Sequence, residues 1–317
     1  RDGAYRSETR GQPGVTSLAV MAFLSAGHSP SEGPFANQLE RAVTFALDCQ
    51  QPSGLLAKHK TPRRVVRYNA GHTVFYNHGI TGLMLGEMYG MSSAEQNALI
   101  RQAIPLAIDF LAQHQFNKPR SGDDGGWRYA YPHMGVHADM SCTAWQLSFL
   151  RSAKNAGFDV PEEIVDGAVA YVERCYDPHQ RVFMYGVYGS ERYPSGGAVG
   201  GAILSLSMAG RHDSEMAKNA ARWLAARRFE RYNSSMGPGN NYHYGAYYAS
   251  QAFFQLGGDH WRKFYPRIVR ALVRNQRANG SWPADAGIAS PYGSVYSTSL
   301  AVLALTPPYQ LVPVLQR

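Results

Sequence analysis

The feature that most restricts the fold of this chain is a segment type that recurs six times. Each segment begins with small or polar residues and continues as an apolar helix rich in Ala, Gly and Ser, and the segments start at Val15, Gly79, Ser141, Ala198, Ala246 and Val295. A helix that is apolar on nearly every face must be buried on every face. Most segments end near a glycine that can stop a helix, at Gly27, Gly90, Gly157, Gly210 and Gly257.

A more amphipathic helix follows each of the first five segments, over residues 35–51, 94–115, 161–175, 214–229 and 261–276. A sixth, over 309–317, is short and contains proline, so we expect it to be poorly formed. Inner and outer helices paired six times predict an all-α fold, a closed (α/α)6 toroid. We expect one domain over 1–317, with the two chain ends close together.

Glutamine, glycine and an aromatic residue recur at the ends of the outer helices. Gln276, Gly280 and Trp282 have the form Gln-x-x-x-Gly-x-Trp, and Gln50 with Gly54 repeats it with Leu56 in place of Trp. After an insertion, Gln115 is followed by Gly125-Gly126-Trp127. We expect Gln to bind helix-end backbone groups, Gly to turn the chain and the aromatic ring to pack between repeats.

These motifs, together with the buried Ala- and Gly-rich helices, resemble the terpenoid cyclase and protein prenyltransferase α/α-toroid superfamily, with squalene–hopene cyclases the nearest enzymes. The resemblance implies a central cavity that the inner-helix starts face, and an isoprenoid-type ligand. It covers essentially the whole chain. Asp2-Gly3-Ala4-Tyr5 is similar to the tail of another such motif, which implies that the chain is part of a longer parent.

The acid motif of class II cyclases is degenerate here. Those enzymes protonate an alkene with Asp-x-Asp-Asp, and the matching residues are Asp139-Met140-Ser141-Cys142, so Ser141 stands where the resemblance places the proton donor. The Asp-rich magnesium motif of class I cyclases is absent from the inner helices. A prenyltransferase-like zinc site from Asp139, Cys142 and His243 is not expected, and we predict neither a metal nor a cofactor.

Histidines and tyrosines recur at the starts of the inner helices. We expect these starts to gather at one rim of the toroid, because its inner helices run parallel. The predicted catalytic residues are His78, Asp139, His243 and Tyr244. The predicted substrate-binding residues are Tyr76, His133, His137, Tyr242 and Tyr292.

Three functions remain open at this point. The first is a cyclase- or prenyltransferase-like protein whose cavity holds a hydrophobic isoprenoid, since aromatic faces stabilise carbocations. The second is a lyase-like enzyme acting on a polysaccharide with His and Tyr as acid and base, since aromatic rings stack on sugars. The third is a non-catalytic interaction domain.

The net charge of +8 permits an anionic partner, although a basic, solvated surface is the simpler interpretation. The basic cluster from Lys58 to Arg67 carries no nucleic-acid motif, and we predict no nucleic-acid partner. No apolar run reaches the roughly 20 residues of a membrane span, which leaves only peripheral association with a membrane. Three widely spaced cysteines do not settle the compartment. We interpret Asp123-Asp124 as a solvated turn.

Overall fold

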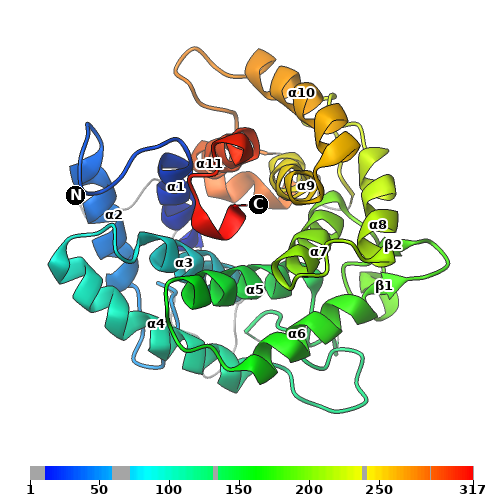
Figure 1. Cartoon of the computed structure of the whole chain (residues 1–317), viewed down its shortest axis with the longest axis horizontal. Coiled ribbons are helices and arrows are strands. Elements are labelled where there is room, and N and C mark those ends of the chain that lie inside the picture. The colour runs from blue at the N-terminus through cyan, green and yellow to red at the C-terminus, as the bar shows by residue number, and fades with distance from the viewer. Residues whose placement is uncertain (1–10, 59–71, 131–134, 238–240, 286, 317) are drawn as a thin grey trace.

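The computed structural model describes residues 11–58, 72–130, 135–237, 241–285 and 287–316, which form eleven α-helices arranged as a closed ring (Figure 1). The inner helices are α1 (Gly14–Ser25), α3 (Val74–Met88), α5 (Met140–Asn155), α7 (Gly196–Met208), α9 (Tyr242–Leu256) and α11 (Gly293–Leu305). The outer helices are α2 (Ala36–Asp48), α4 (Ala94–His114), α6 (Glu162–Arg174), α8 (Glu215–Ala225) and α10 (Gly258–Arg274). The predicted all-α toroid is confirmed.

The ring closes because α11 packs against α1, and every other inner helix contacts the next one in the chain. The two chain ends, which we expected to lie close together, fall outside the described residues. No helix in the described part of the chain is both long enough and apolar enough to cross a bilayer.

Glycines let neighbouring inner helices approach closely. A Cβ added at Gly82 of α3 would lie 2.6 Å from the ring of Phe149 on α5. A Cβ added at Gly200 of α7 would lie 2.8 Å from the backbone of Tyr248 on α9. In both pairs, the missing side chain of one helix makes room for a large side chain or the backbone of the next.

The sixth outer helix does not form, as its proline content predicts. In its place are two 3₁₀ turns, η4 (Pro307–Tyr309) and η5 (Pro313–Leu315), and the C-terminal segment lies over the middle of the ring in Figure 1. Hydrogen bonds to α3 and α9 hold it there: the Val314 N–H donates to Glu87 Oε2 over 3.1 Å, and Gln255 Nε2 donates to the Leu315 and Gln316 carbonyls over 3.1 and 3.0 Å. This segment covers the end of the ring at which the inner helices terminate.

The other end of the ring is built from the connections that precede the inner helices. The connection between α6 and α7 contains a two-residue antiparallel pair, β1 (Tyr176–Asp177) with β2 (Val182–Phe183), and the 3₁₀ turn η2 (Gly189–Glu191). Another 3₁₀ turn, η3 (Gly287–Tyr292), precedes α11. The connections of the ring are longest at this end.

Gln and Gly residues of the recurring motif join one outer helix to the next, through hydrogen bonds and a close backbone contact. Gln115 Nε2 donates to the Gly125 carbonyl in its own loop and, over 2.8 Å, to the Ile164 carbonyl of α6. Gln50 makes the corresponding bond to the Ala103 carbonyl of α4. Gly125 has a φ of +82°, and a Cβ there would lie 2.1 Å from the Gly167 carbonyl oxygen of α6.

Gln276 can be compared with Gln115 and Gln50, because it occupies the same position in the motif but no outer helix follows it. It is exposed, and its Nε2 donates to the Gly280 carbonyl of its own loop. Each tryptophan of the motif bonds to the outer helix that precedes it: Trp127 Nε1 donates to the Leu111 carbonyl and Trp282 Nε1 to the Leu272 carbonyl.

We expect Gln115→Leu to lower the free energy of unfolding by about 2–3 kcal/mol, because it leaves two carbonyl groups without their donor. Gln276→Leu is the matched control and is expected to cost less than about 1 kcal/mol. Chemical denaturation of both variants measures the difference. Equal losses would show that Gln115 does not join the outer helices.

Candidate functional site

A central cavity of about 580 Å³ opens at the end of the ring where the inner helices begin. Every inner helix contributes to its lining, through Gly14, Tyr76, Ser141, Gly197, Tyr244 and Tyr296 in chain order. The remaining lining residues come mostly from the connections before these helices. This is the rim at which we expected the helix starts to gather, and a cavity of this size accommodates a small-molecule ligand.

The wall of the cavity is aromatic, and its rings carry hydroxyl groups. Its aromatic residues are Tyr76, Tyr129, Trp145, Tyr185, Tyr193, Tyr244, Tyr292 and Tyr296. Tyr185 stacks on Tyr193 with ring centroids 5.3 Å apart, and its hydroxyl lies 3.0 Å from that of Tyr129. Burial raises the pKa of the Tyr129 and Tyr185 phenols, and that of Tyr193 to about 12. These phenols therefore keep their protons at neutral pH.

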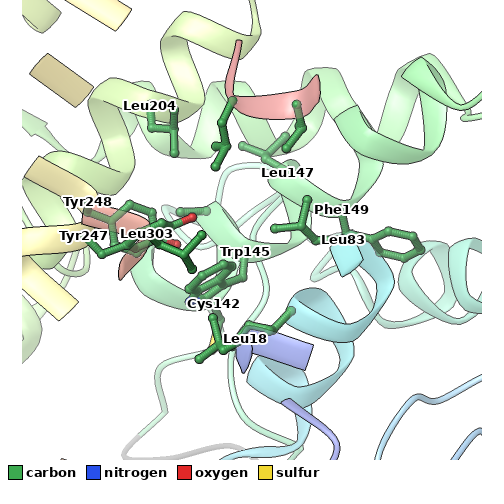
Figure 2. Close-up of a cluster of buried hydrophobic side chains, with 14 of the residues drawn as sticks. Leu18, Leu83, Cys142, Trp145, Leu147, Phe149, Leu204, Tyr247, Tyr248 and Leu303 are labelled. Carbon is green, nitrogen blue, oxygen red and sulfur yellow. The ribbon is translucent and has the colours of Figure 1, made fainter. Parts of the chain in front are cut away.

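The floor of the cavity is apolar. Val15, Leu18 and Ile80 line it together with Trp145, which is buried and stacks on Tyr247 with centroids 5.5 Å apart. Figure 2 shows Trp145 beside Leu18 and Cys142, among buried side chains that come from all six inner helices. The cavity thus ends on the hydrophobic core, which continues to the covered end of the ring.

Arg128 is the one cationic Lys or Arg among the described lining residues, and it is almost fully buried, at 4% exposure. Its Nη2 lies 3.3 Å from Glu191 Oε2 and its Nη1 lies 3.7 Å from Asp139 Oδ2. The guanidinium also sits over the Tyr129 ring, 4.6 Å from its centroid. Burial alone would lower the pKa of Arg128, but Asp139 and the neighbouring groups raise it above its usual value, so the side chain stays charged.

Asp139 lies behind Arg128 and does not line the cavity. It is fully buried at the N-cap of α5, where Oδ1 accepts the Cys142 N–H over 2.8 Å. Burial raises the pKa of its carboxyl group to about 6, although Arg128 acts in the opposite direction. The residue of the degenerate acid motif that does reach the cavity is Ser141.

Several buried polar atoms at the cavity have no hydrogen-bond partner among the described residues. They are Nε and Nη1 of Arg128, Nε1 of Trp145, Oδ1 of Asn241 and the hydroxyl oxygen of Tyr244. Buried polar groups are nearly always paired in folded proteins, so a cluster of unpaired donors and acceptors around one cavity favours a polar ligand.

Of the nine predicted site residues, Tyr76, Tyr244 and Tyr292 line the cavity. The predicted convergence of His78, Asp139, His243 and Tyr244 on it is wrong, since only Tyr244 is in the lining. His78 is fully buried between α3 and α4: the Leu56 N–H donates to its Nδ1 over 3.1 Å, and its Nε2–H donates to the Ala107 carbonyl over 3.2 Å. Both ring nitrogens therefore serve the packing of the ring.

His243 also turns away from the cavity. Its Nδ1 faces the carboxylate of Asp285, and its Nε2 lies 3.3 Å from the Tyr232 hydroxyl. Tyr242, beside it, is fully buried and donates to the Phe229 carbonyl over 2.7 Å. Neither residue is in the cavity lining, because the first turn of α9 points Tyr244, rather than its two predecessors, inward.

The third group of predicted residues lies before α5. His137 stacks on Phe116 with centroids 4.3 Å apart and lines a separate pocket of about 240 Å³, and His133 lies outside the described residues. Asp123 is not solvated, contrary to our interpretation. It is 1% exposed and accepts the His137 backbone N–H over 2.8 Å, and so it holds the loop in place.

Within the described ranges, no group of three His, Cys, Asp or Glu side chains is arranged to hold a metal ion. Cys142 is buried behind the cavity and His243 is engaged by Asp285, so the ligands of the zinc site considered above do not meet.

Three functional candidates that line the cavity, Arg128, Tyr129 and Glu191, were not predicted from the sequence. Arg128 follows Trp127 of the recurring motif, which offered a signal, because the residue after the packed indole enters the connection to the next inner helix. Glu191 lies in η2, an irregular connection whose path toward the cavity no local pattern indicates.

No protein-family model and no curated protein matches the chain. Several solved structures are similar to it. It is similar to an α-1,6-mannanase of Salegentibacter in complex with α-1,6-mannotetrose, at 11% identity and a TM-score of 0.63, covering 96% of this chain and 92% of that one. It is similar to the cellobiose 2-epimerase of Bacillus thermoamylovorans, at 13% identity and a TM-score of 0.60, with 93% and 87% covered.

The chain is also similar to the type II terpene cyclase MstE from Scytonema in complex with merosterolic acid A, at 15% identity and a TM-score of 0.55, with 99% and 92% covered. At these identities the likeness shows the fold alone. The chain is an α/α toroid, and the terpene cyclase is one of several kinds of protein that share this architecture.

The environment of His78 predicts a pH dependence of stability. Burial lowers the pKa of His78 to about 3, whereas the unfolded chain has the usual value of 6.5. Its contribution is therefore fully present above pH 6.5 and is lost as the pH falls toward 3, by up to about 1.4 kcal/mol per pH unit.

We expect the free energy of unfolding of the wild type to fall more steeply between pH 7 and pH 5 than that of His78→Gln. Denaturant titrations of both proteins across this range measure the difference. Parallel curves would contradict the assignment of a neutral, buried His78.

Proposed function

We propose that the chain is an enzyme that acts on a carbohydrate held in the central cavity. The observation that carries this proposal is the set of unpaired donors and acceptors, Arg128, Trp145 and Asn241, set among tyrosine rings. A sugar satisfies both features, because its C–H faces stack on aromatic rings while its hydroxyl groups pair with polar atoms. The solved mannanase and epimerase, whose names refer to sugars, are consistent with this use of the fold.

The charged groups of the cavity favour β-elimination, which begins with removal of a proton from carbon, over hydrolysis of a glycosidic bond. Hydrolysis of a glycosidic bond usually employs two carboxyl groups on either side of it, and Glu191 is the one carboxylate among the described lining residues. A single carboxylate base with phenolic proton donors suits β-elimination from a uronic acid. In this reaction the acidic proton lies beside the sugar carboxylate, and a cation is needed to neutralise that group.

In this assignment Arg128 binds the sugar carboxylate through its guanidinium group, whose Nε has no hydrogen-bond partner among the described residues. Glu191 removes the proton from the neighbouring carbon, and the electron pair forms a carbon–carbon double bond. The bond to the leaving sugar oxygen breaks, and Tyr129 donates its proton to that oxygen. Tyr185, hydrogen-bonded to Tyr129, and Asp139, paired with Arg128, are positioning residues.

We expect Glu191→Gln to reduce turnover of a uronate-containing polysaccharide by about 10²–10⁴-fold, the usual contribution of a general base, with little change in melting temperature. Tyr129→Phe keeps the ring and removes the proton donor, so it should lower kcat more than it changes KM. Glu163→Gln, on the exposed face of α6, is the control. The assay follows the ultraviolet absorbance of the new double bond. Binding without turnover would favour a non-catalytic domain, and turnover that survives Glu191→Gln would overturn the assignment.

The apolar floor formed by Val15, Leu18 and Ile80 favours a second candidate, an isoprenoid-type ligand whose tail reaches Trp145. Alkene-protonating cyclisation is not part of this candidate, because Ser141 is the residue of the acid motif that reaches the cavity, and it stands where the resemblance places the proton donor.

We expect no cyclic product when the chain is incubated with squalene and the extract is analysed by gas chromatography. The physical reason is that a serine hydroxyl is far too weak an acid to protonate an alkene. A product that disappears in Asp139→Asn would show that the buried carboxyl group does act as the acid.

A further inference from the structure

The net charge of the chain is concentrated on two adjacent outer helices. Residues 211–231 and 258–277, which contain α8 and α10, hold twelve of the 31 Lys and Arg residues and four of the 23 Asp and Glu residues. They therefore carry the whole formal excess of +8, and the rest of the chain has nineteen residues of each sign. α8 and α10 contact each other on the outer wall of the ring (Figure 1).

The exposed face of α10 arranges part of this charge as a ridge. Lys263, Arg267, Arg270 and Arg274 are exposed and follow one another at the spacing i, i+4, i+7, i+11. This is the spacing of one helix face, so the four cations form a straight row about 16 Å long. Arg277, just beyond the helix, is exposed as well.

The arginines of this ridge have no acidic partner in the described part of the chain. Asp259 pairs with Arg262 and Lys263 near the start of α10, and no ion pair joins Arg267, Arg270 or Arg274 to a carboxylate. Like charges at i, i+4 oppose helix formation, so folding gains nothing from the row.

We propose that the wall formed by α8 and α10 binds an acidic polysaccharide, a linear chain that carries carboxylate or sulfate groups. A straight row of cations fits a linear polyanion, and five of the six cations in residues 258–277 are arginines, whose guanidinium groups bind carboxylate and sulfate in bidentate geometry. This surface lies on the outer wall, so the proposal does not depend on the reaction assigned to the cavity.

Two other polyanions fit the wall less well. A membrane surface requires apolar side chains that insert beside the basic ones, and Val273 is the one large hydrophobic residue strongly exposed on this wall within the described residues. Single-stranded nucleic acid is usually bound with free aromatic rings, and the ring of Trp223 is covered by the guanidinium of Arg227, 4.2 Å from its centroid.

The test compares two triple variants of the full chain with equal changes in net charge. Arg267→Gln/Arg270→Gln/Arg274→Gln removes the ridge, and Arg41→Gln/Arg101→Gln/Arg151→Gln removes exposed arginines of α2, α4 and α5. Polygalacturonate and heparin are the probes, and binding is measured over a series of salt concentrations.

We expect the ridge variant to bind both probes about tenfold or more weakly, since each arginine–anion pair is worth up to about 1 kcal/mol. Its slope of log Kd against log salt should fall by about one unit for each such pair removed. The control variant should change affinity less than about threefold, and the ridge variant should melt no lower than the wild type.

Equal weakening of both variants would overturn the proposal, since it would show attraction to net charge alone. Absence of binding to either probe would also overturn it. Tighter binding to vesicles of phosphatidylserine, or to a DNA oligonucleotide, would overturn it in favour of a different polyanion. A cavity variant such as Glu191→Gln should bind the probes on this wall as the wild type does, so failure of the proposed reaction and failure of this surface are distinguished.

Discussion

The architecture depends on the close approach of helices that are buried on every side. Two neighbouring pairs of inner helices approach closely because one helix of the pair lacks a side chain at the contact, at Gly82 facing Phe149 and at Gly200 facing Tyr248. Tyr248 packs against Trp145 with ring centroids 5.4 Å apart, so the contact that joins α7 to α9 also supports the floor of the cavity. The site and the core therefore share side chains.

Most of the fold could be predicted from the sequence, because the burial of a helix determines the periodic pattern of its apolar residues. Helices with no polar face, each followed by an amphipathic one, specify inner and outer layers before any contact is known. The same regularity placed Tyr76, Tyr244 and Tyr292 at the cavity, since each lies at the start of an inner helix and inner helices of a toroid run parallel.

The histidines were misplaced because a helix start fixes position along the axis but not direction around it. His78 and His243 lie at the expected height, and the turn of the helix directs them to Ala107 and Asp285 instead of the cavity. Glu191 was missed for a different reason. It reaches the cavity through an irregular connection, where no repeat pattern relates sequence to space. The ridge on α10 was not predicted from the sequence, since its four cations are separated along the chain and lie together only on one face of the helix.

The C-terminal segment has a consequence for how a polymer could use the ring. Held by Glu87 and Gln255, it closes the end at which the inner helices terminate, and the layer around Trp145 fills the space between this segment and the cavity. The toroid is therefore a cup rather than a tunnel. A long chain cannot thread through it and be processed as it slides; an end or a bent loop must enter, and must leave by the same mouth before the next unit is admitted.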